Sequence, residues 1–389
     1  MRLLKSLTCF FLFGFFTTGC KIEYRPSVPS TKTGYLVVEG FINSGNGPTT
    51  ITLSRTINVY DDSTRDSHEH NAIMSIEGEN TESYPLYETG DGVYTSSSLQ
   101  LNSNEKYRLK IKTQYGKEYE SEYSSYLTTP DVDSLSWTRD NNGVKIYINT
   151  HDDQTQPGYY YWKYEETWEI HSTYYSTIQY LYNPGSPLPY GVGYRNNDQT
   201  PDTSLYRCWQ DVPSSNINIG SSEKLNRNVI YFPIMSIEPQ SRKLSILYSI
   251  KVLQYAISKD AYSYLGILKS NSEDIGSIIG PLPSGLTGNI HCIATPAETV
   301  IGFVEVSQEK QSKRLFISND ELSGWGYKMQ CAEYIIGNGP QSLQDNSDLY
   351  PTIPYETRLG LILSFYATPE PNCVDCRLLG SSIKPAFWP

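Results

Sequence analysis

The sequence predicts a mainly β protein with two domains, and three observations support this prediction. The chain of 389 residues contains 33 tyrosines, and tyrosine is enriched in β-strands. Windows rich in Ala, Glu and Leu, which favour helices, are scarce. Short runs of β-branched and aromatic residues alternate with Gly, Asn, Asp and Pro, which is the pattern of short strands joined by turns.

Residues 1–19 are interpreted as a lipoprotein signal peptide. Arg2 and Lys5 precede a short apolar run over residues 7–16, well below the roughly 20 residues that a membrane-spanning helix needs. Because a cysteine directly after such a signal is a lipidation site, we expect a fatty acid such as palmitate on Cys20. Residues 20–33 are then a lipid-anchored tether. The alternative is an ordinary secretory signal with a cysteine there by chance.

The charge of the chain excludes one class of ligand. The formal net charge is −11 at pH 7, whereas nucleic-acid binding depends on neutralising phosphates with Lys and Arg. We therefore expect no nucleic-acid partner. The export signal places the bulk of the chain in an aqueous and oxidising compartment, where disulfides persist.

The first domain is expected over residues 34–129, as a β-sandwich of Ig-like or transthyretin-like type. The stretch GDGVYTSS (90–97) is typical of a tight turn that enters a strand. Thr128-Thr129-Pro130 is expected to be the domain boundary. Further strands are expected at residues 35–42, 49–56, 72–77, 107–113 and 117–125.

The remainder, residues 130–389, is expected to be a larger, mostly-β domain with one or two short helices. The best helix candidate is 259–268, with Ser258 as N-cap and Asp260 in the first turn. Residues 176–198 contain several Pro and Gly residues and are expected to form a loop. A hairpin is expected at 134–149, and a turn-rich connection at 280–290. Further strands are expected at 158–170, 242–257, 298–307 and 313–318, and the last of these is expected to be the final strand of the chain.

Five cysteines follow Cys20, and two of them form a Cys-x-x-Cys pair near the C-terminus. A redox pair normally opens a helix, and a zinc site needs a second pair or suitably spaced histidines. Neither context is evident, so we expect disulfides that fix the tail, with one cysteine unpaired because the number is odd. The pairing is left open among Cys208, Cys292, Cys331, Cys373 and Cys376.

Aromatic side chains are the main candidates for a binding or interface surface. Tyrosine offers a large apolar area with a polar tip, and sugars stack on aromatic rings. Trp388, next to the end of the chain, either packs against the body or faces a partner. The alternative for the other rings is the core of a β-sandwich together with a solvated aromatic face. The candidates are Tyr160, Trp162, Tyr164, Tyr180, Tyr182, Tyr190, Tyr194 and Trp388.

Catalytic motifs are not recognisable in the sequence. It contains no G-x-S-x-G, H-E-x-x-H or P-loop pattern, and we expect neither an enzyme nor a cofactor. The stretch DDSTRDSHEH (61–70) offers the run His68-Glu69-His70, together with Asp61, Asp62 and Asp66, as possible cation ligands. A solvated loop is the preferred interpretation, and no metal site is predicted.

Seven stretches follow one another in a recognisable order along the chain. They are GYLVVEGFIN (34–43), TTITLSRT (49–56), GDGVYTSSSL (90–99), YRLKI (107–111), TTPDVDSLSW (128–137), GNIHC (288–292) and CVDCRLLGSSIKPAFWP (373–389). With them the chain resembles the lipoproteins of domain-of-unknown-function family 4249, from Gram-negative bacteria that carry SusC-like transporters. The family's tail usually has Gly-Gly-Thr before a Lys-Pro-x-Phe-Trp ending, whereas this chain has Gly380-Ser381-Ser382.

The resemblance implies a lipid-anchored outer-membrane protein without an assigned enzymatic activity, of a kind often encoded beside TonB-dependent transporters. Lys21 and Glu23 partly match the charged residues that follow the cysteine in surface-exposed lipoproteins of this group. We therefore expect a cell-surface lipoprotein that acts as an accessory subunit of a TonB-dependent, SusC-like outer-membrane barrel. The alternative is a lipoprotein that binds a glycan or a peptide on its own.

Overall fold

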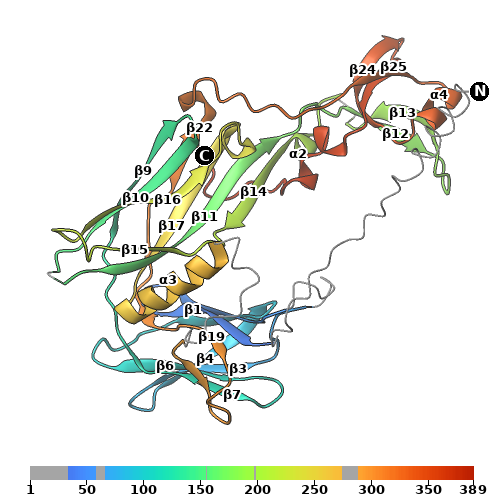
Figure 1. The fold of residues 1–389 in the computed structure, drawn as a ribbon. Coiled ribbons are helices and arrows are strands. Elements are labelled where there is room, and N and C mark those ends of the chain that lie inside the picture. The colour runs from blue at the N-terminus through green and yellow to red at the C-terminus, as the bar shows by residue number, and fades with distance from the viewer. Residues whose placement is uncertain (1–33, 58–65, 155, 197–198, 274–287) are drawn as a thin grey trace, which may run out of the picture.

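The computed structural model describes residues 34–57, 66–154, 156–196, 199–273 and 288–389. The expected signal peptide and tether, Cys20 included, lie outside the described residues, as do Asp61 and Asp62. The fold is mainly β, as predicted, and has three units, each with a hydrophobic core of its own (Figure 1). Within the described part of the chain, no helix combines the length and the apolar character needed to cross a membrane.

The first unit is one sheet of eleven strands folded around a single core. Its order is β18-β7-β6-β3-β4-β5-β2-β1-β19, with β8 beside β6 and β20 beside β1. Alternate side chains point inward, as in β6, where Tyr107, Leu109 and Ile111 are buried. The strands from the start of the chain are β1 (Leu36–Asn43), β2 (Pro48–Arg55), β3 (Ile73–Gly78), β4 (Ser83–Gly90), β5 (Val93–Ser98), β6 (Lys106–Lys112), β7 (Glu118–Ser121) and β8 (Ser124–Ser125).

The strands expected over residues 35–125 are confirmed, apart from one split and one omission. The strand expected at 117–125 is divided into β7 and β8. Strand β4 is not expected from the sequence, because only Leu86 among its eight residues is buried and it shows no apolar alternation.

Three short strands from late in the chain complete the sheet of the first unit. β18 (Ile290–Cys292) pairs with β7, whereas β19 (Val300–Gly302) and β20 (Val306–Ser307) run parallel to β1. The sequence assigns this segment to the second domain from its position in the chain. Its hydrogen bonds instead place it in the first sheet, so the chain enters the first unit twice.

The central unit consists of two packed sheets. A three-stranded sheet, in the order β16-β10-β9, shares a core with a six-stranded sheet, in the order β14-β11-β17-β21, with β15 beside β11 and β22 beside β17. The expected hairpin and the long aromatic strand are confirmed as β9–β10 and β11. The strands are β9 (Val132–Asp140), β10 (Gly143–His151), β11 (Tyr159–His171), β14 (Arg207–Pro213), β15 (Asn218–Ser221), β16 (Val229–Ile237), β17 (Leu247–Ala256), β21 (Lys310–Gln311) and β22 (Leu315–Ser318).

Helix α3 (Lys259–Glu273) packs between the first and central units (Figure 1). It is the helix expected from the sequence, extended at its C-terminal end. Its Ala261 lies in a small core with Ile219 of β15, against which Phe41 of β1 also packs. The carboxylate of Glu305 accepts a hydrogen bond from the backbone N–H of Ser258, just before the helix, at 3.0 Å.

Buried hydroxyls also join these two units. The Ser307 hydroxyl donates to the carbonyl oxygen of Ala256 at 2.8 Å, and the backbone N–H of Ala256 donates to the Thr129 hydroxyl at 3.0 Å. Ser307 belongs to the first sheet and Ala256 to the central sheet. The junction is therefore held by specific hydrogen bonds as well as by apolar packing.

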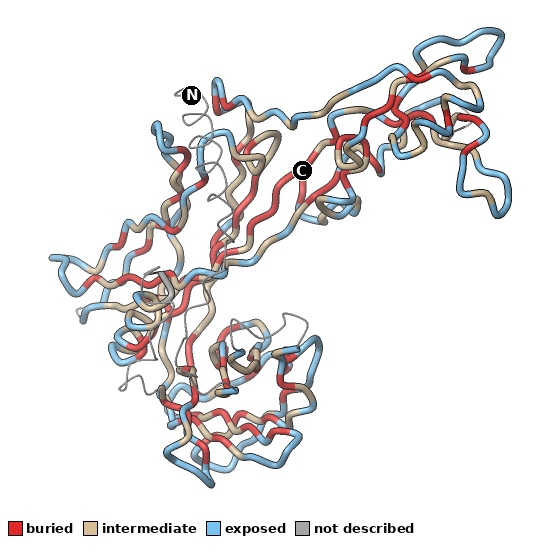
Figure 2. The backbone as a smooth tube through the Cα atoms, turned by 45° about the vertical axis from the view of Figure 1, so that its right-hand side comes forward, coloured by how far each residue is buried: buried red, intermediate tan, exposed pale blue. Residues whose placement is uncertain are grey.

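The distal unit extends from the central unit, at the end of the molecule opposite the first unit (Figure 1). It contains the hairpin β12 (Ile178–Tyr182)–β13 (Pro189–Tyr194) and a sheet in the order β23-β25-β24. Figure 2 shows buried backbone along the strands of the central unit and exposed tips on the distal unit. Its other elements are β23 (Tyr334–Gly337), α4 (Pro340–Asp345), β24 (Tyr350–Arg358) and β25 (Leu361–Thr368).

Three sequence expectations about the C-terminal half are wrong. Within the stretch expected to be a loop, residues 178–194 form a hairpin, because a Pro- and Gly-rich turn hides the strand pattern around the buried Ile178 and Val192. The strands do not end at residue 318, because β23, β24 and β25 follow. The strand expected at 242–257 begins instead with a short 3-10 helix, η1 (Arg242–Leu244), before β17.

Candidate functional site

The aromatic residues of β11 are part of the core, which corrects their interpretation as surface candidates. Tyr160, Trp162 and Tyr164 are buried among the residues of the central core. The indole N–H of Trp162 donates to the side-chain oxygen of Gln254 at 2.8 Å. β11 lies in the middle of its sheet, so its inward-facing side chains meet the opposing sheet and do not reach a ligand or a partner.

The tyrosines of the distal hairpin have a different environment. Tyr182 and Tyr190 are exposed, at 50% and 54% of their surface. Tyr180 and Tyr194 are half-buried and pack against the distal core. The Tyr180 hydroxyl donates to the backbone carbonyl of Asn346 at 2.8 Å. Of the four hairpin tyrosines, Tyr182 and Tyr190 are therefore the ones accessible to a partner.

Further large apolar side chains are exposed on the same unit. Together with the two hairpin tyrosines they form what we call the distal apolar surface. Most of these residues are not predicted from the sequence, because strands β23–β25 are not expected there, although the runs YIIG (334–337) and LILSFYAT (361–368) are typical of strands. The surface consists of Tyr182, Leu188, Tyr190, Tyr334, Ile335, Tyr350, Ile353, Tyr355, Leu359, Leu361 and Leu363.

Two separate excursions of the chain build the distal unit, and both begin and end at the central unit. The first leaves after β11 and returns through α2 (Thr203–Tyr206) into β14. The second leaves after η2 (Asn319–Glu321) and returns through η3 (Pro371–Cys373) and η4 (Cys376–Leu378). Backbone hydrogen bonds join the two excursions, from Tyr174 N–H to the Cys373 carbonyl at 2.9 Å and from Thr177 N–H to the Thr352 carbonyl at 2.8 Å.

Two disulfides close the base of the distal unit. Cys208–Cys376 joins the return points of the two excursions across a sequence separation of 168 residues. Cys331–Cys373 joins the outgoing and returning segments of the second excursion. The two residues of the Cys-x-x-Cys pair are thus bonded to different distant cysteines, as expected for a structural tail. Cys292 is buried in the first unit and is not in a disulfide.

The buried carboxylate of Glu169, near the end of β11, binds the C-terminal tail. Its oxygens accept hydrogen bonds from the Trp388 indole N–H at 3.0 Å and from the Arg207 guanidinium at 2.6 and 3.0 Å, and lie 2.7 Å from His171 Nε2. Burial would raise the pKa of Glu169, but the bonds from His171, Arg207 and Trp388 outweigh it and lower the pKa to about 2.

Trp388 is therefore a buried anchor and not an interface residue. It is 4% exposed, and its ring meets Phe316 of β22 edge to face at 5.7 Å between centroids. The neighbouring Phe387 is partly exposed, and the Arg314 guanidinium lies 3.7 Å from the centroid of its ring. Of the two alternatives left open for the tail aromatics, Trp388 therefore packs against the body of the protein and does not face a partner.

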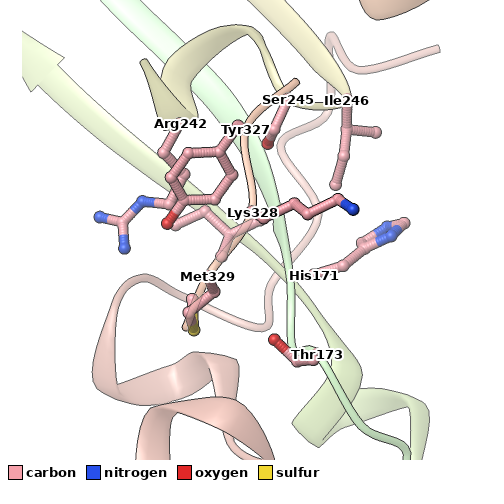
Figure 3. Close-up of a pocket in the computed structure, with 9 residues that line it drawn as sticks. His171, Thr173, Arg242, Ser245, Ile246, Tyr327, Lys328 and Met329 are labelled. Carbon is pink, nitrogen blue, oxygen red and sulfur yellow. The ribbon is translucent and has the colours of Figure 1, made fainter. Parts of the chain in front are cut away.

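A cavity of about 340 Å³ lies where the central unit meets the base of the distal unit. Figure 3 shows Thr173 and Met329 on one side and Arg242 and Tyr327 on another, with the Lys328 ammonium on the same side as His171. The cavity is lined by Ile170, His171, Thr173, Arg242, Ser245, Ile246, Tyr327, Lys328 and Met329.

The lining of this junction cavity favours a negatively charged group. Arg242 and Lys328 are both cationic, and no carboxylate is among the lining residues. Within the described part of the chain, neither side chain makes an ion pair or a hydrogen bond. The hydroxyls of Thr173 and Ser245 add neutral hydrogen-bonding groups. The arrangement can hold a carboxylate or similar anion, but it contains no nucleophile paired with a base.

Comparison with known families finds a match over most of the chain. The model of the family described as domain of unknown function DUF4249 matches residues 21–313. No curated protein matches the chain.

Among solved structures, similarity is weak. A DUF4785 family protein from Legionella pneumophila is 8% identical, with a TM-score of 0.19, over 56% of this chain, and the match spans about half of that protein, 51%. The BSP domain of a biofilm-associated protein is 7% identical, with a TM-score of 0.13, over 90% of this chain and 79% of that one.

Replacing the buried carboxylate should destabilise the protein in a pH-dependent way. The pKa of Glu169 is lower in the folded state than its ordinary value of 4.5, so its contribution is present above pH 4.5 and is lost as the pH falls toward 2. We expect Glu169→Gln to lower the free energy of unfolding by about 3 kcal/mol at pH 7. Urea unfolding from pH 3 to 7 should show that the difference in unfolding free energy between the wild type and the variant becomes smaller below pH 4.5. The exposed Glu79→Gln is the control, and a difference independent of pH would contradict the assignment.

Peptide mapping of the non-reduced protein should identify the two disulfides and leave Cys292 as a free thiol. Replacing Cys208 and Cys376 together by Ser should lower the free energy of unfolding by about 4–5 kcal/mol, because a long loop is released in the unfolded state. The Cys331–Cys373 disulfide closes a shorter loop, so replacing both of its cysteines by Ser should lower the free energy of unfolding by about 4 kcal/mol. A direct Cys373–Cys376 bond in the peptide map would refute this arrangement.

Proposed function

The chain belongs to the DUF4249 family, and we propose that it is a non-enzymatic lipoprotein of the outer-membrane surface. Cys20 carries its lipid anchor. Its role is that of an accessory subunit of a TonB-dependent, SusC-like transporter. The contact with the transporter is made through the distal apolar surface. The exposure of these apolar side chains is the observation that carries this choice of contact site.

The composition of the distal apolar surface supports a protein interface. Exposed apolar patches on folded monomers mark interaction sites, and the exposed apolar side chains of this unit come from β12, β13, β23, β24, β25 and the turns that connect them. Five of its members are the tyrosines at positions 182, 190, 334, 350 and 355. Tyrosine is enriched at interfaces, because it buries a large apolar area while its hydroxyl keeps a hydrogen-bonding partner.

The construction of the distal unit suits a contact that is formed without reordering. It has its own core, and both of its excursions are tied at the base by disulfides and backbone hydrogen bonds. A surface that is rigid before binding loses less conformational entropy when a partner docks. This small unit can therefore form a specific interface even if only a moderate surface area is buried between it and its partner.

The position of the distal unit also suits this role. The tether of residues 20–33 leads into the first unit, and the distal unit lies at the other end of the molecule (Figure 1). Fourteen tether residues span at most roughly 50 Å when fully extended. Anchoring one end of the protein leaves the apolar end free to meet a neighbouring membrane protein.

Purification from native membranes tests the proposal. A tagged wild-type protein should bring down a TonB-dependent transporter in stoichiometric amount, as identified by mass spectrometry. The double variant Tyr182→Ser/Tyr190→Ser should recover at least about tenfold less transporter, because central aromatic residues dominate interface energies.

The matched control for that experiment replaces two exposed tyrosines of the first unit. Tyr87→Ser/Tyr115→Ser removes side chains that are 67% and 81% exposed, and it should bring down as much transporter as the wild type. Equal recovery by all three proteins would reject the distal apolar surface as the contact. Absence of any transporter from the wild-type eluate would reject the proposed function itself.

The junction cavity favours a second candidate function, direct capture of a peptide or an acidic glycan. Arg242 and Lys328 would bind a carboxylate of such a ligand. Binding of a peptide and glycan library to the purified protein should then be lost in Arg242→Ala/Lys328→Ala. It should persist in the exposed control Lys224→Ala/Arg227→Ala. Binding that is the same in both variants would exclude the cavity as the site.

A further inference from the structure

Three side chains with metal-binding atoms converge on the first unit, beside the strands β2 and β4. The residues are Asp66, His68 and His70, and one ligand atom from each lies within 4.8 Å of the others. The segment is extended, and His68 forms a bridge to Ser54 at the end of β2. An extended backbone points alternate side chains to opposite sides. His68 and His70 therefore project outward together, while the intervening Glu69 is buried and paired with Arg55.

Asp66 lies between the two imidazole rings. Its Oδ1 is 2.8 Å from Nδ1 of His68, and its Oδ2 is 2.8 Å from Nε2 of His70. The backbone N–H of His68 also donates to Oδ1 at 2.9 Å, which fixes the orientation of the carboxylate. The sequence favours a solvated loop here, and these residues do lie outside the named strands. In the structure they form a cluster of two imidazoles and one carboxylate.

Glu88 supplies an independent indication that the cluster is a ligand set. Its Oε1 lies 2.7 Å from Nδ1 of His70, the ring nitrogen that does not face Asp66. Its Oε2 accepts from the backbone N–H of Asn71 at 2.8 Å, so the carboxylate is itself held in place. A carboxylate on the far nitrogen of an imidazole is the arrangement that orients histidines bound to metals. Both ring nitrogens of His70 therefore have a carboxylate neighbour: Nδ1 faces Glu88, and Nε2 faces Asp66 in the middle of the cluster.

We propose that Asp66, His68 and His70 bind a divalent transition-metal ion of the Zn²⁺ or Cu²⁺ class, with Glu88 as the positioning residue of His70. Imidazole nitrogens suit these borderline metals, whereas Ca²⁺ and Mg²⁺ prefer sets made of oxygen atoms. Three protein ligands leave a fourth tetrahedral position open to water or to a group from another molecule.

The geometry requires only a small adjustment to accept the ion. Donor atoms bound to one Zn²⁺ at 2.0–2.1 Å are roughly 3.3 Å apart, which is about half an ångström more than the present contacts to Asp66. The side chains of Asp66, His68 and His70 are 58%, 41% and 31% exposed. They are therefore free to separate by this distance, and the ion can reach them from the surrounding solution.

Calorimetric titration of the untagged mature chain with Zn²⁺ tests the proposal. We expect one site per chain, with affinity lowered by at least tenfold in His68→Ala and in His70→Ala. Glu88→Gln should weaken binding by about tenfold without removing it, because the ligand atoms are retained. His151→Ala removes an exposed histidine that is also paired with a carboxylate, Asp133, and it should bind as the wild type does.

Titration with Co²⁺ gives a second, direct readout of the ligand set. Tetrahedral Co²⁺ bound through imidazole absorbs intensely in the visible region, and Zn²⁺ should displace it. This absorption should be absent in His68→Ala/His70→Ala, with thermal unfolding confirming that the variant is folded. Zn²⁺ binding that survives in the double variant, or no saturable binding by the wild type at millimolar metal, would overturn the proposal.

Discussion

The closure of the base of the distal unit is the constraint on which the C-terminal half of the structure depends. The chain leaves the central unit twice to build that unit and must bring four strand ends back to one place. Cys208–Cys376 and Cys331–Cys373 link three of those ends covalently. At the fourth, the end of β11, the Glu169 carboxylate binds the tail through Trp388 and holds Arg207 at the start of β14. A terminus that would otherwise fray is thus part of the central core. The Cys-x-x-Cys pair and the aromatic ending serve one purpose, because they fix the tail that follows the second excursion.

This closure has a consequence for function. A small unit of two hairpin-like excursions would be marginally stable if it were isolated, since its core contains few buried residues. Tied at its base, it presents exposed tyrosines and aliphatic residues at a defined position far from the first unit. The proposal of a transporter subunit follows from that exposed surface together with the expected anchor at Cys20. The metal site proposed on the first unit is independent of it, because it uses other residues at the other end of the molecule.

Much of the fold follows from local sequence patterns, and the part that does not depends on long-range pairing. Strands such as β1, β6 and β11 show alternation or dense β-branched and aromatic residues, so they are predictable. The return of β18–β20 to the first sheet is not, since three short strands carry no signal of the partner they will join. The candidate site shows the same limit. Tyr160 and Tyr182 look alike in sequence, yet one lies in the middle of a six-stranded sheet and the other at a hairpin tip. The cluster of Asp66, His68 and His70 is visible as a motif, but the role of Glu88 appears only once β4 is placed beside it.

Site-specific photocrosslinking in native membranes tests the central claim most directly. A photoreactive amino acid would be placed at Tyr182, Tyr190 or Leu361 on the distal unit, and at Tyr87 or Tyr115 on the first unit. The account predicts crosslinks to a TonB-dependent transporter from the distal positions and none from the first unit. Crosslinks to the transporter from the first unit alone, or from none of the five positions, would contradict it.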